Sequence, residues 1–150
     1  MERLPKYKWL MQIAIATAKI STCCRIQVGA VIERDGRIIS TGYNGSAPGA
    51  EHCIDHFGIA QEYTNNLFAT KHHEWALRNE IHAEINAIIF AARKGIMIEG
   101  SHMYVTHMPC ITCSKYIVQA GITRVVYFND YEGDTDKYIF KDSGVEIIKL

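Results

Sequence analysis

Three residues that can bind a transition metal and one carboxylate occupy two short motifs. A His-x-Glu motif places His82 two residues before Glu84, and a later Pro-Cys-x-x-Cys motif contains Cys110 and Cys113. A structural zinc ion is normally held by four protein ligands, whereas a catalytic zinc ion keeps one position for water. Because the histidine and the two cysteines supply only three ligands, the spacing indicates a zinc site that activates water beside a carboxylate.

The order of the two motifs resembles the signature of zinc-dependent nucleobase deaminases. In such a site the zinc ion would lower the pKa of its water from about 15.7 towards roughly 7, and hydroxide would attack the ring carbon that bears the amino group. On a helix, Glu84 points roughly 200° from His82, which favours a position outside the ligand set. We therefore expect Glu84 to take the water proton, protonate the ring nitrogen and then protonate the departing ammonia.

Other interpretations of the same residues remain open. A Cys-x-x-Cys pair can be half of a structural zinc site or a redox pair, and His-x-Glu alone occurs often by chance. His107 or His102 could supply a fourth zinc ligand, and His107, in the turn before the cysteines, is the better placed. A closed shell of this kind would describe a zinc-stabilised binding module, in which Glu84 has no role.

Each motif is predicted to start a helix. Residues three apart share one helix face, so Cys110 and Cys113 can bind one ion together, and the preceding Pro109 suits a first helical turn. His82 is expected to open a helix of strong helix formers that extends to Arg93. Thiolates near a helix N-terminus are stabilised by unpaired amides and the helix dipole. Two helix starts are therefore expected to converge on the metal.

The remaining segments predict a hairpin followed by alternating strands and helices. Asp35-Gly36 separates two β-rich runs and predicts a tight hairpin turn, and Gly121 marks the end of the helix that carries the cysteines. We expect helices at 6–20 and 134–142, and strands at 28–34, 37–43, 102–105, 124–128 and 145–148. The polar region from 44 to 79 is hard to assign, apart from a short helix near 75–77. This order favours an α/β sandwich with a mixed sheet and covering helices.

Length and composition describe one ordinary globular domain. The chain has 150 residues, of which 48% are hydrophobic and 21% charged, and no apolar run approaches the roughly 18 residues of a membrane span. The N-terminus lacks a signal-peptide pattern, and five cysteines, an odd number, argue against a secreted disulfide framework. We expect a reduced, cytoplasmic protein that does not bind membranes.

The charge balance bears on the substrate. Sixteen basic residues match sixteen acidic ones, whereas a protein that follows a polynucleotide backbone usually has a basic excess or stripe. The balance favours a small nucleotide over a nucleic-acid polymer.

Most of the chain resembles the deoxycytidylate deaminases, enzymes that convert dCMP to dUMP for thymidylate synthesis. The resemblance rests on residues 28–32, 41–45 and 80–88, and on 103–106 together with 109–113. It implies a single CMP/dCMP-type deaminase domain over residues 1–150, built as a three-layer cytidine-deaminase-like sandwich with a mixed five-stranded sheet. It also implies that His82, Cys110 and Cys113 bind zinc and that Glu84 is the proton donor.

The resemblance implies substrate contacts as well. Asn44 would contact the sugar, although a turn asparagine that caps its own backbone is the alternative. Arg25 is a candidate for the phosphate, as is Lys19. The Ala83 amide, a free donor at a helix start, would bind the pyrimidine carbonyl.

Family members are typically homohexamers, activated by dCTP and inhibited by dTTP with Mg²⁺. By resemblance, Asn44 and Gly45 are candidates for the wall of an effector pocket. Phe90 and Arg93 could couple an interface to the catalytic helix, or could serve only as core packing and a solvated charge. The proline at 48 stands later than the family pattern has it, so the effector loop and its regulation can differ.

A second metal site is also implied. Some deoxycytidylate deaminases carry a structural zinc ion in the long insertion, and here Cys23, Cys53 and His72 could bind it, with Glu80 or His73 as the fourth ligand. An insertion without an obvious core would gain stability from such an ion. The alternative is that Cys23 and its neighbour Cys24 are small buried hydrophobic residues.

The substrate itself is the remaining choice. The charge balance weighs against tRNA adenosine, and the Gly-Tyr-Asn-Gly stretch weighs against dCTP or free cytidine as the substrate. A bifunctional enzyme that acts on both dCMP and dCTP remains open.

Overall fold

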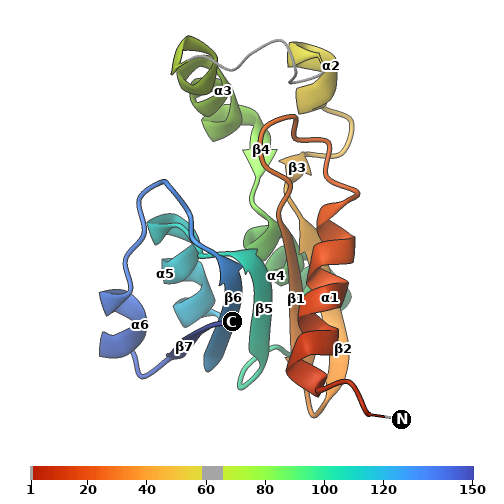
Figure 1. Ribbon diagram of the computed structural model, residues 1–150, viewed down its shortest axis with the longest axis vertical. Helices are drawn as coiled ribbons and strands as arrows, with labels where there is room; N and C mark the ends of the chain where they lie inside the picture. The colour runs from red at the N-terminus through yellow and green to blue at the C-terminus, as the bar shows by residue number, and fades with distance from the viewer. Residues whose placement is uncertain (1, 59–65) are drawn as a thin grey trace.

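The computed structural model describes residues 2–58 and 66–150, and a five-stranded mixed sheet forms its centre (Figure 1). The strand order is β2-β1-β5-β6-β7. β1 runs antiparallel to both β2 and β5, while β5, β6 and β7 are mutually parallel. The strands are β1 (Gly29–Arg34), β2 (Arg37–Tyr43), β5 (His102–His107), β6 (Arg124–Asn129) and β7 (Glu146–Lys149). The predicted mixed five-stranded sheet is therefore present.

Helices cover both faces of this sheet and complete three layers. α1 (Lys6–Ala18) buries Leu10 and Ala14 against β1 and β5 on one face. α4 (Ala83–Lys94), α5 (Ile111–Gln119) and the short α6 (Tyr138–Asp142) cover the other face, where the larger hydrophobic core lies. No helix in the described parts of the chain has the length and apolarity needed to cross a membrane.

The hairpin between β1 and β2 forms where the Asp-Gly pair predicts it. Asp35 and Gly36 adopt φ angles of 52° and 79°, the left-handed region that a tight hairpin turn requires. The Gly36 amide donates a hydrogen bond to the Glu33 carboxylate, and the register shifts between Ile32 and Glu33. This turn holds β1 and β2 in the register that carries Asn44 to the far end of β2.

The described residues between 44 and 81 contain four elements, of which the sequence pattern predicts only part of one. They are β3 (Gly45–Ser46), α2 (Cys53–Phe57), α3 (Asn66–Asn79) and β4 (Glu80–Ile81). β3 pairs antiparallel with β4 through Gly45 with Ile81 and Ser46 with Glu80. Figure 1 shows α2 and α3 beyond one end of the sheet, with this small ladder between them and the main body. The helix expected at 75–77 is the last part of the longer α3.

Gly42 allows α4 to approach the sheet closely. A Cβ atom at Gly42 would lie 2.3 Å from the Ala83 carbonyl oxygen and 2.5 Å from the Ala87 nitrogen, both on the backbone of α4. Gly29 has the same role on the opposite face, where a Cβ atom would lie 2.1 Å from the Ala14 carbonyl oxygen of α1. Only glycine fits this spacing, so residue 42 determines how near the start of α4 lies to β2.

Candidate active site

The three predicted ligands meet at one point of the structure. His82 Nδ1 lies 3.5 Å from Cys110 Sγ and 3.4 Å from Cys113 Sγ, and one ligand atom from each residue lies within 4.8 Å of the others. A tetrahedral zinc ion with bonds of about 2.3 Å to sulfur and about 2.1 Å to nitrogen would separate these atoms by about 3.6 Å. The donor set and its spacing therefore fit a zinc ion.

The first ligand of each motif stands one residue before the helix that was predicted to begin there. His82 is the N-cap of α4 and Cys110 the N-cap of α5, each with an extended backbone. The Cys110 sulfur accepts a hydrogen bond from the Cys113 amide at 3.4 Å. Cap positions place the two side chains beyond the free amides of the first helical turn, where negative charge on sulfur is stabilised.

Hydrogen bonds between the ligands set their protonation states. The hydrogen bond from Cys113, helped by one with His82 and opposed by burial, lowers the pKa of Cys110 to about 4. The hydrogen bond with Cys110 raises the pKa of His82 to about 9, and the same hydrogen bonding between the thiols raises the pKa of Cys113. The lowered pKa of Cys110 favours its thiolate, the form in which cysteine binds zinc.

Glu84 lies beside the ligands without joining them. Its side chain is in the first turn of α4 and is 4% exposed. Burial raises the pKa of the Glu84 carboxyl, while the charge of His82 and a hydrogen bond with Cys113 lower it. A buried carboxyl with a raised pKa, next to a metal site but outside its ligand set, can accept and return a proton near neutral pH.

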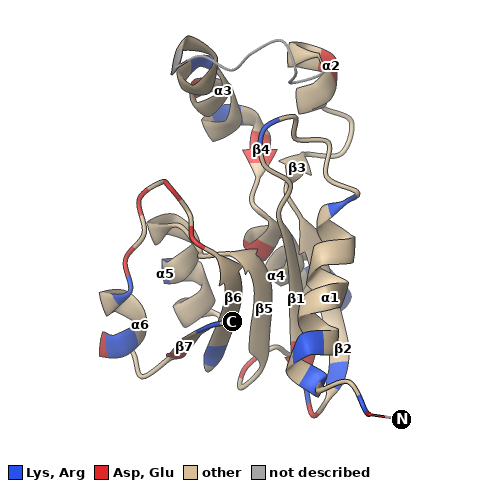
Figure 2. Cartoon of the chain, viewed as in Figure 1, with Lys and Arg blue, Asp and Glu red and all other residues tan. Residues whose placement is uncertain are grey.

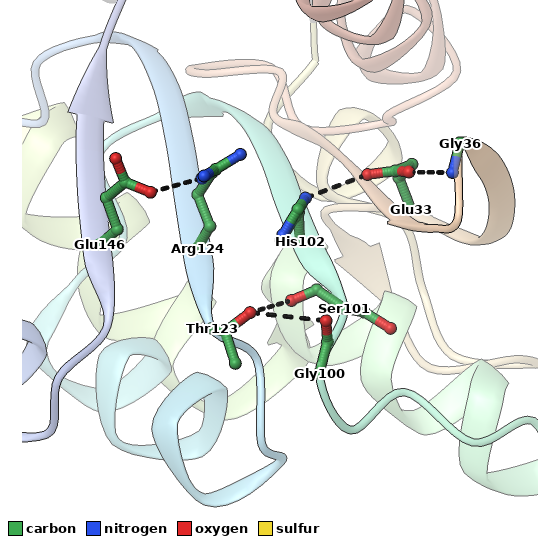
Figure 3. Close-up of polar contacts among 8 residues, drawn as sticks. All are labelled: Glu33, Gly36, Gly100, Ser101, His102, Thr123, Arg124 and Glu146. Carbon is green, nitrogen blue, oxygen red and sulfur yellow. Dashed lines mark hydrogen bonds and ion pairs between the residues drawn. The ribbon is translucent and has the colours of Figure 1, made fainter.

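The two further histidines considered as a fourth ligand lie elsewhere. His102 begins β5 and points toward Glu33 on the neighbouring strand, with 3.2 Å between His102 Nδ1 and Glu33 Oε2 (Figure 3). His107 ends β5, where its Nδ1 lies 3.0 Å from the Thr106 hydroxyl and burial lowers its pKa. Within the described part of the chain, neither belongs to a group that could hold a metal.

Asn44 is buried and binds a neighbouring loop. Its Oδ1 accepts from the Val28 amide at 2.8 Å, its Nδ2 donates to the Ile26 carbonyl at 2.9 Å, and its own carbonyl accepts from the Ser21 hydroxyl at 2.7 Å. The self-capping turn considered from the sequence is thus not what these hydrogen bonds describe. Asn44 instead connects the end of β2 to the loop that carries Arg25.

Tyr131 is a candidate that the sequence reasoning did not identify. Its half-buried ring packs against the core cluster that contains Cys113. Burial raises the pKa of Tyr131, the charges of Cys110 and Glu84 raise it further, and the charge of Arg25 lowers it. Tyr131 therefore lies within electrostatic range of both the ligand set and the exposed Arg25. Lys19, the C-cap of α1, is also exposed.

The other candidates occupy surface or backbone positions. Ala83 is the first residue of α4, where an amide has no partner within the helix. Gly45 pairs with Ile81 in the small ladder. Phe90 and Arg93 lie on the exposed side of α4, and Phe90 is 45% exposed.

The loop between β6 and α6 contains several acidic residues (Figure 2). This loop is joined to the start of α5 by a hydrogen bond from the Ile111 amide to the Asp134 carbonyl.

A second group of potential ligands has four members. Cys23, Cys53, His72 and Glu80 each offer one atom within 4.8 Å of the others. His72 Nε2 lies 3.4 Å from Cys23 Sγ and 3.3 Å from Cys53 Sγ. Glu80 Oε1 is buried without a hydrogen-bond partner in the described structure, and burial raises the pKa of this carboxyl to about 7. The set fits a closed four-ligand zinc shell.

The structure distinguishes between the two residues considered as the fourth ligand of this group. Glu80 belongs to it, whereas His73 is exposed on α3. Cys24 is half-buried, and although its sulfur lies 3.4 Å from Cys53 Sγ, it is outside the four-residue set. Burial is also the main reason that the pKa of Cys24 is raised.

Comparisons with known proteins agree with this geometry. The sequence model for the cytidine and deoxycytidylate deaminase zinc-binding region matches residues 4–129. The chain is 40% identical to the deoxycytidylate deaminase of Enterobacteria phage T4, over 97% of this chain and 90% of that protein. It is also 40% identical to ComE operon protein 2 of Bacillus subtilis, over 98% of this chain and 72% of that protein.

A solved structure extends the likeness to three dimensions. The crystal structure of dCMP deaminase from the cyanophage S-TIM5, in complex with dCMP and dUMP, superposes with a TM-score of 0.78 at 30% identity. The match covers 99% of this chain and 100% of that one. The predicted three-layer sandwich of the cytidine-deaminase type is confirmed.

Proposed function

The chain belongs to the cytidine and deoxycytidylate deaminase family, and from this premise we propose that it hydrolyses dCMP to dUMP and ammonia. The observation that carries the proposal is the set of three ligands, His82, Cys110 and Cys113, with the buried Glu84 beside them. Relatives at 40% and 39% identity over 97% of the chain are named deoxycytidylate deaminases. The dCMP deaminase structure in complex with dCMP and dUMP, a neighbour over nearly the whole chain, adds support for the same substrate.

In the proposed mechanism each residue has one task. His82 Nδ1 and the sulfurs of Cys110 and Cys113 hold a zinc ion, which when bound supplies the Lewis acidity that makes hydroxide available near neutral pH. The Glu84 carboxylate takes a proton from the attacking water and passes it to the ring nitrogen of cytosine. It then takes the remaining proton of the hydroxyl that has added to the ring carbon and delivers it to the amino group, and the C–N bond breaks to release ammonia. Water and dCMP are consumed, and dUMP and ammonia are formed.

The proposed substrate contacts are carried over from the family resemblance. We assign the Ala83 amide to the pyrimidine carbonyl, Asn44 to the sugar and Arg25 to the phosphate. The position of Arg25 near Tyr131 supports its assignment, because Tyr131 is itself within range of Cys110 and Glu84. Lys19 remains the second candidate for the phosphate.

Replacement of Arg25 by Ala tests the phosphate assignment. A hydrogen bond between charged groups contributes about 1.5–3 kcal/mol, so we expect the KM for dCMP to rise roughly 10- to 100-fold with kcat little changed. Deoxycytidine, which lacks the phosphate, serves as the control substrate, and its steady-state constants should be equal in the two proteins. An unchanged KM for dCMP in this variant, with a raised one in Lys19→Ala, would transfer the role to Lys19.

The alternative functions are deaminases with another substrate and a binding module that has no substrate. A bifunctional dCMP/dCTP deaminase or another cytidine-type deaminase would use the same catalytic residues, and a zinc-stabilised binding module would need a closed shell at the first site. An ultraviolet assay of deamination with dCMP, dCTP, cytidine and dAMP separates them. We expect dCMP to be the preferred substrate by kcat/KM, and a lack of turnover of all four would reject the enzyme.

We further propose a second, structural zinc ion held by Cys23, Cys53, His72 and Glu80. The partnerless carboxylate oxygen of Glu80 supports it, since a buried oxygen without a partner costs free energy that a metal bond would offset. Regulation by dCTP and by dTTP with Mg²⁺, with Asn44 and Gly45 at the effector pocket, is carried over from the family resemblance. So is a homohexamer in which the exposed Phe90 and neighbouring Arg93 couple an interface to Glu84.

Replacement of His72 by Ala tests the second metal site. The imidazole contacts both Cys23 and Cys53, so its loss should reduce the zinc content from about two ions per chain to about one. Because metal binding contributes to folding free energy, the melting temperature should fall by at least several degrees. Elemental analysis and thermal unfolding measure the two effects. His73→Ala, an exposed neighbour on the same helix, should change neither, and two zinc ions retained in His72→Ala would reject the assignment.

A further inference from the structure

A third cysteine, Cys24, lies beside the second group of potential ligands but is not one of its four members. Cys24 Sγ lies 3.4 Å from Cys53 Sγ, and the Cys24 amide donates to the same sulfur at 3.4 Å. Cys23, Cys53, His72 and Glu80 already supply four ligand atoms. All five cysteines of the chain are free thiols in this structure. Cys24 is thus a neighbour of the metal site with no ligand role.

The three sulfurs differ in access to solvent. Cys53 is 0% exposed and Cys23 is 6% exposed, whereas Cys24 is half-buried. A small oxidant can therefore reach Cys24 first. The sulfur nearest to it, that of Cys53, is the one whose loss would open the four-ligand shell.

We propose that Cys24 and Cys53 are a redox pair, and that their oxidation to a disulfide removes Cys53 from the second site and releases its zinc ion. The inference rests on the proposed structural zinc ion. In this proposal Cys24 is the residue that peroxide or a small-molecule disulfide oxidises first.

The chemistry balances with hydrogen peroxide as the oxidant. The Cys24 sulfur attacks one peroxide oxygen, the O–O bond breaks, and the leaving hydroxide takes up the thiol proton to form water, which leaves a sulfenic acid. The Cys53 sulfur, a thiolate while it binds zinc, then attacks the Cys24 sulfur, the S–O bond breaks, and the leaving hydroxide takes a proton from solvent to form a second water. The two sulfurs lose two electrons in total, and one peroxide is reduced to two waters. The sulfurs, 3.4 Å apart, need to approach by only about 1.3 Å to reach the ~2.05 Å of a disulfide.

Loss of the zinc ion would affect the proposed substrate-binding residues, because short hydrogen bonds connect Cys23 to Asn44. The Cys23 amide donates to the Ser21 hydroxyl at 3.2 Å, and that hydroxyl donates to the Asn44 carbonyl at 2.7 Å. Arg25 follows Cys24 directly in the chain. Release of the ion would free the loop that places Asn44 and Arg25, so the oxidised protein should bind dCMP more weakly.

The experiment compares the zinc-loaded protein with its Cys24→Ala variant under the same peroxide dose. A chromogenic chelator measures released zinc, and mass spectrometry of an alkylated digest maps the disulfide. We expect the parent protein to form the Cys24–Cys53 bond and to release one of two zinc ions. Dithiothreitol with added zinc should restore the ion. Cys24→Ala should retain both ions and release zinc at least tenfold more slowly, and Cys24→Ser repeats the test with a polar replacement.

The possible results distinguish a failure of the Cys24–Cys53 redox pair from a failure of the proposed second zinc site. Two zinc ions in untreated Cys24→Ala, with the parent KM for dCMP, support Cys24 as a residue outside the ligand set. Equal rates of zinc release in parent and variant, or a Cys23–Cys53 or Cys110–Cys113 bond in place of Cys24–Cys53, would overturn the redox pair. A zinc content near one before oxidation would overturn the second metal site itself. Two ions both before and after oxidation would overturn only the switch.

Discussion

Glu84→Gln is expected to keep its zinc and lose nearly all deamination of dCMP. The amide has the size of the carboxyl but cannot take a proton from water or return one to ammonia. Positioned proton transfer of this kind contributes about 10²–10⁴-fold, so kcat should fall by at least that factor. Steady-state kinetics and metal analysis on the same preparation measure both quantities.

The stability of this variant provides an independent check. Burial raises the pKa of Glu84, so the carboxyl reduces the stability of the folded protein as the pH rises from the ordinary pKa of a glutamate to the raised one, and this cost is complete above the raised pKa. Gln removes the cost, and the melting temperature near neutral pH should be equal to or above that of the parent. Loss of zinc from Glu84→Gln would contradict the assignment and make Glu84 a ligand.

Gly42→Ala should impair catalysis although residue 42 touches no ligand or reacting atom. A methyl group there would meet the backbone of α4 at Ala83 and Ala87, so the start of the helix that carries Glu84 must move. A misplacement of about 1 Å can cost about 10²-fold in rate, and forced overpacking costs about 1–3 kcal/mol of stability. Kinetics with dCMP and thermal unfolding should show both losses.

Gly29→Ala is the matched control, because the same methyl group would meet the backbone of α1 at Ala14 on the opposite face of the sheet. We expect a similar loss of stability with a much smaller loss of kcat. If the two variants lost kcat equally, the effect of residue 42 would be general unfolding and not displacement of Glu84.

The convergence of His82, Cys110 and Cys113 could be predicted because the information for it is local. The spacing of Cys110 and Cys113, and the helix-forming run after His82, place each motif near a helix start without knowledge of the fold. The sequence pattern missed only that His82 and Cys110 are caps and not helical residues. The order of strands and helices likewise predicted the sheet, since the central strands are short apolar runs that are buried along almost their whole length.

The second group of potential ligands could not be selected from the sequence pattern alone, because its members are brought together by tertiary packing. His72 and His73 are adjacent in the sequence, and only the packing of α3 directs one toward Cys53 and leaves the other exposed. β3 and β4 are two residues long, too short for any periodic signal, yet their pairing positions Glu80. Tyr131 was missed for the same reason, because a loop without periodicity brings its ring toward the ligands.

The capping geometry of the two catalytic helices also suggests how the protein can be engineered. His82 and Cys110 precede α4 and α5, so the chemistry depends on the first turn of each helix. α4 has 12 residues, and at 1.5 Å per residue its far end at Gly95 lies about 18 Å away. The side chain of Met97, 64% exposed in the segment that follows α4, is therefore a position where a fluorophore can be attached while the reaction centre keeps its shape.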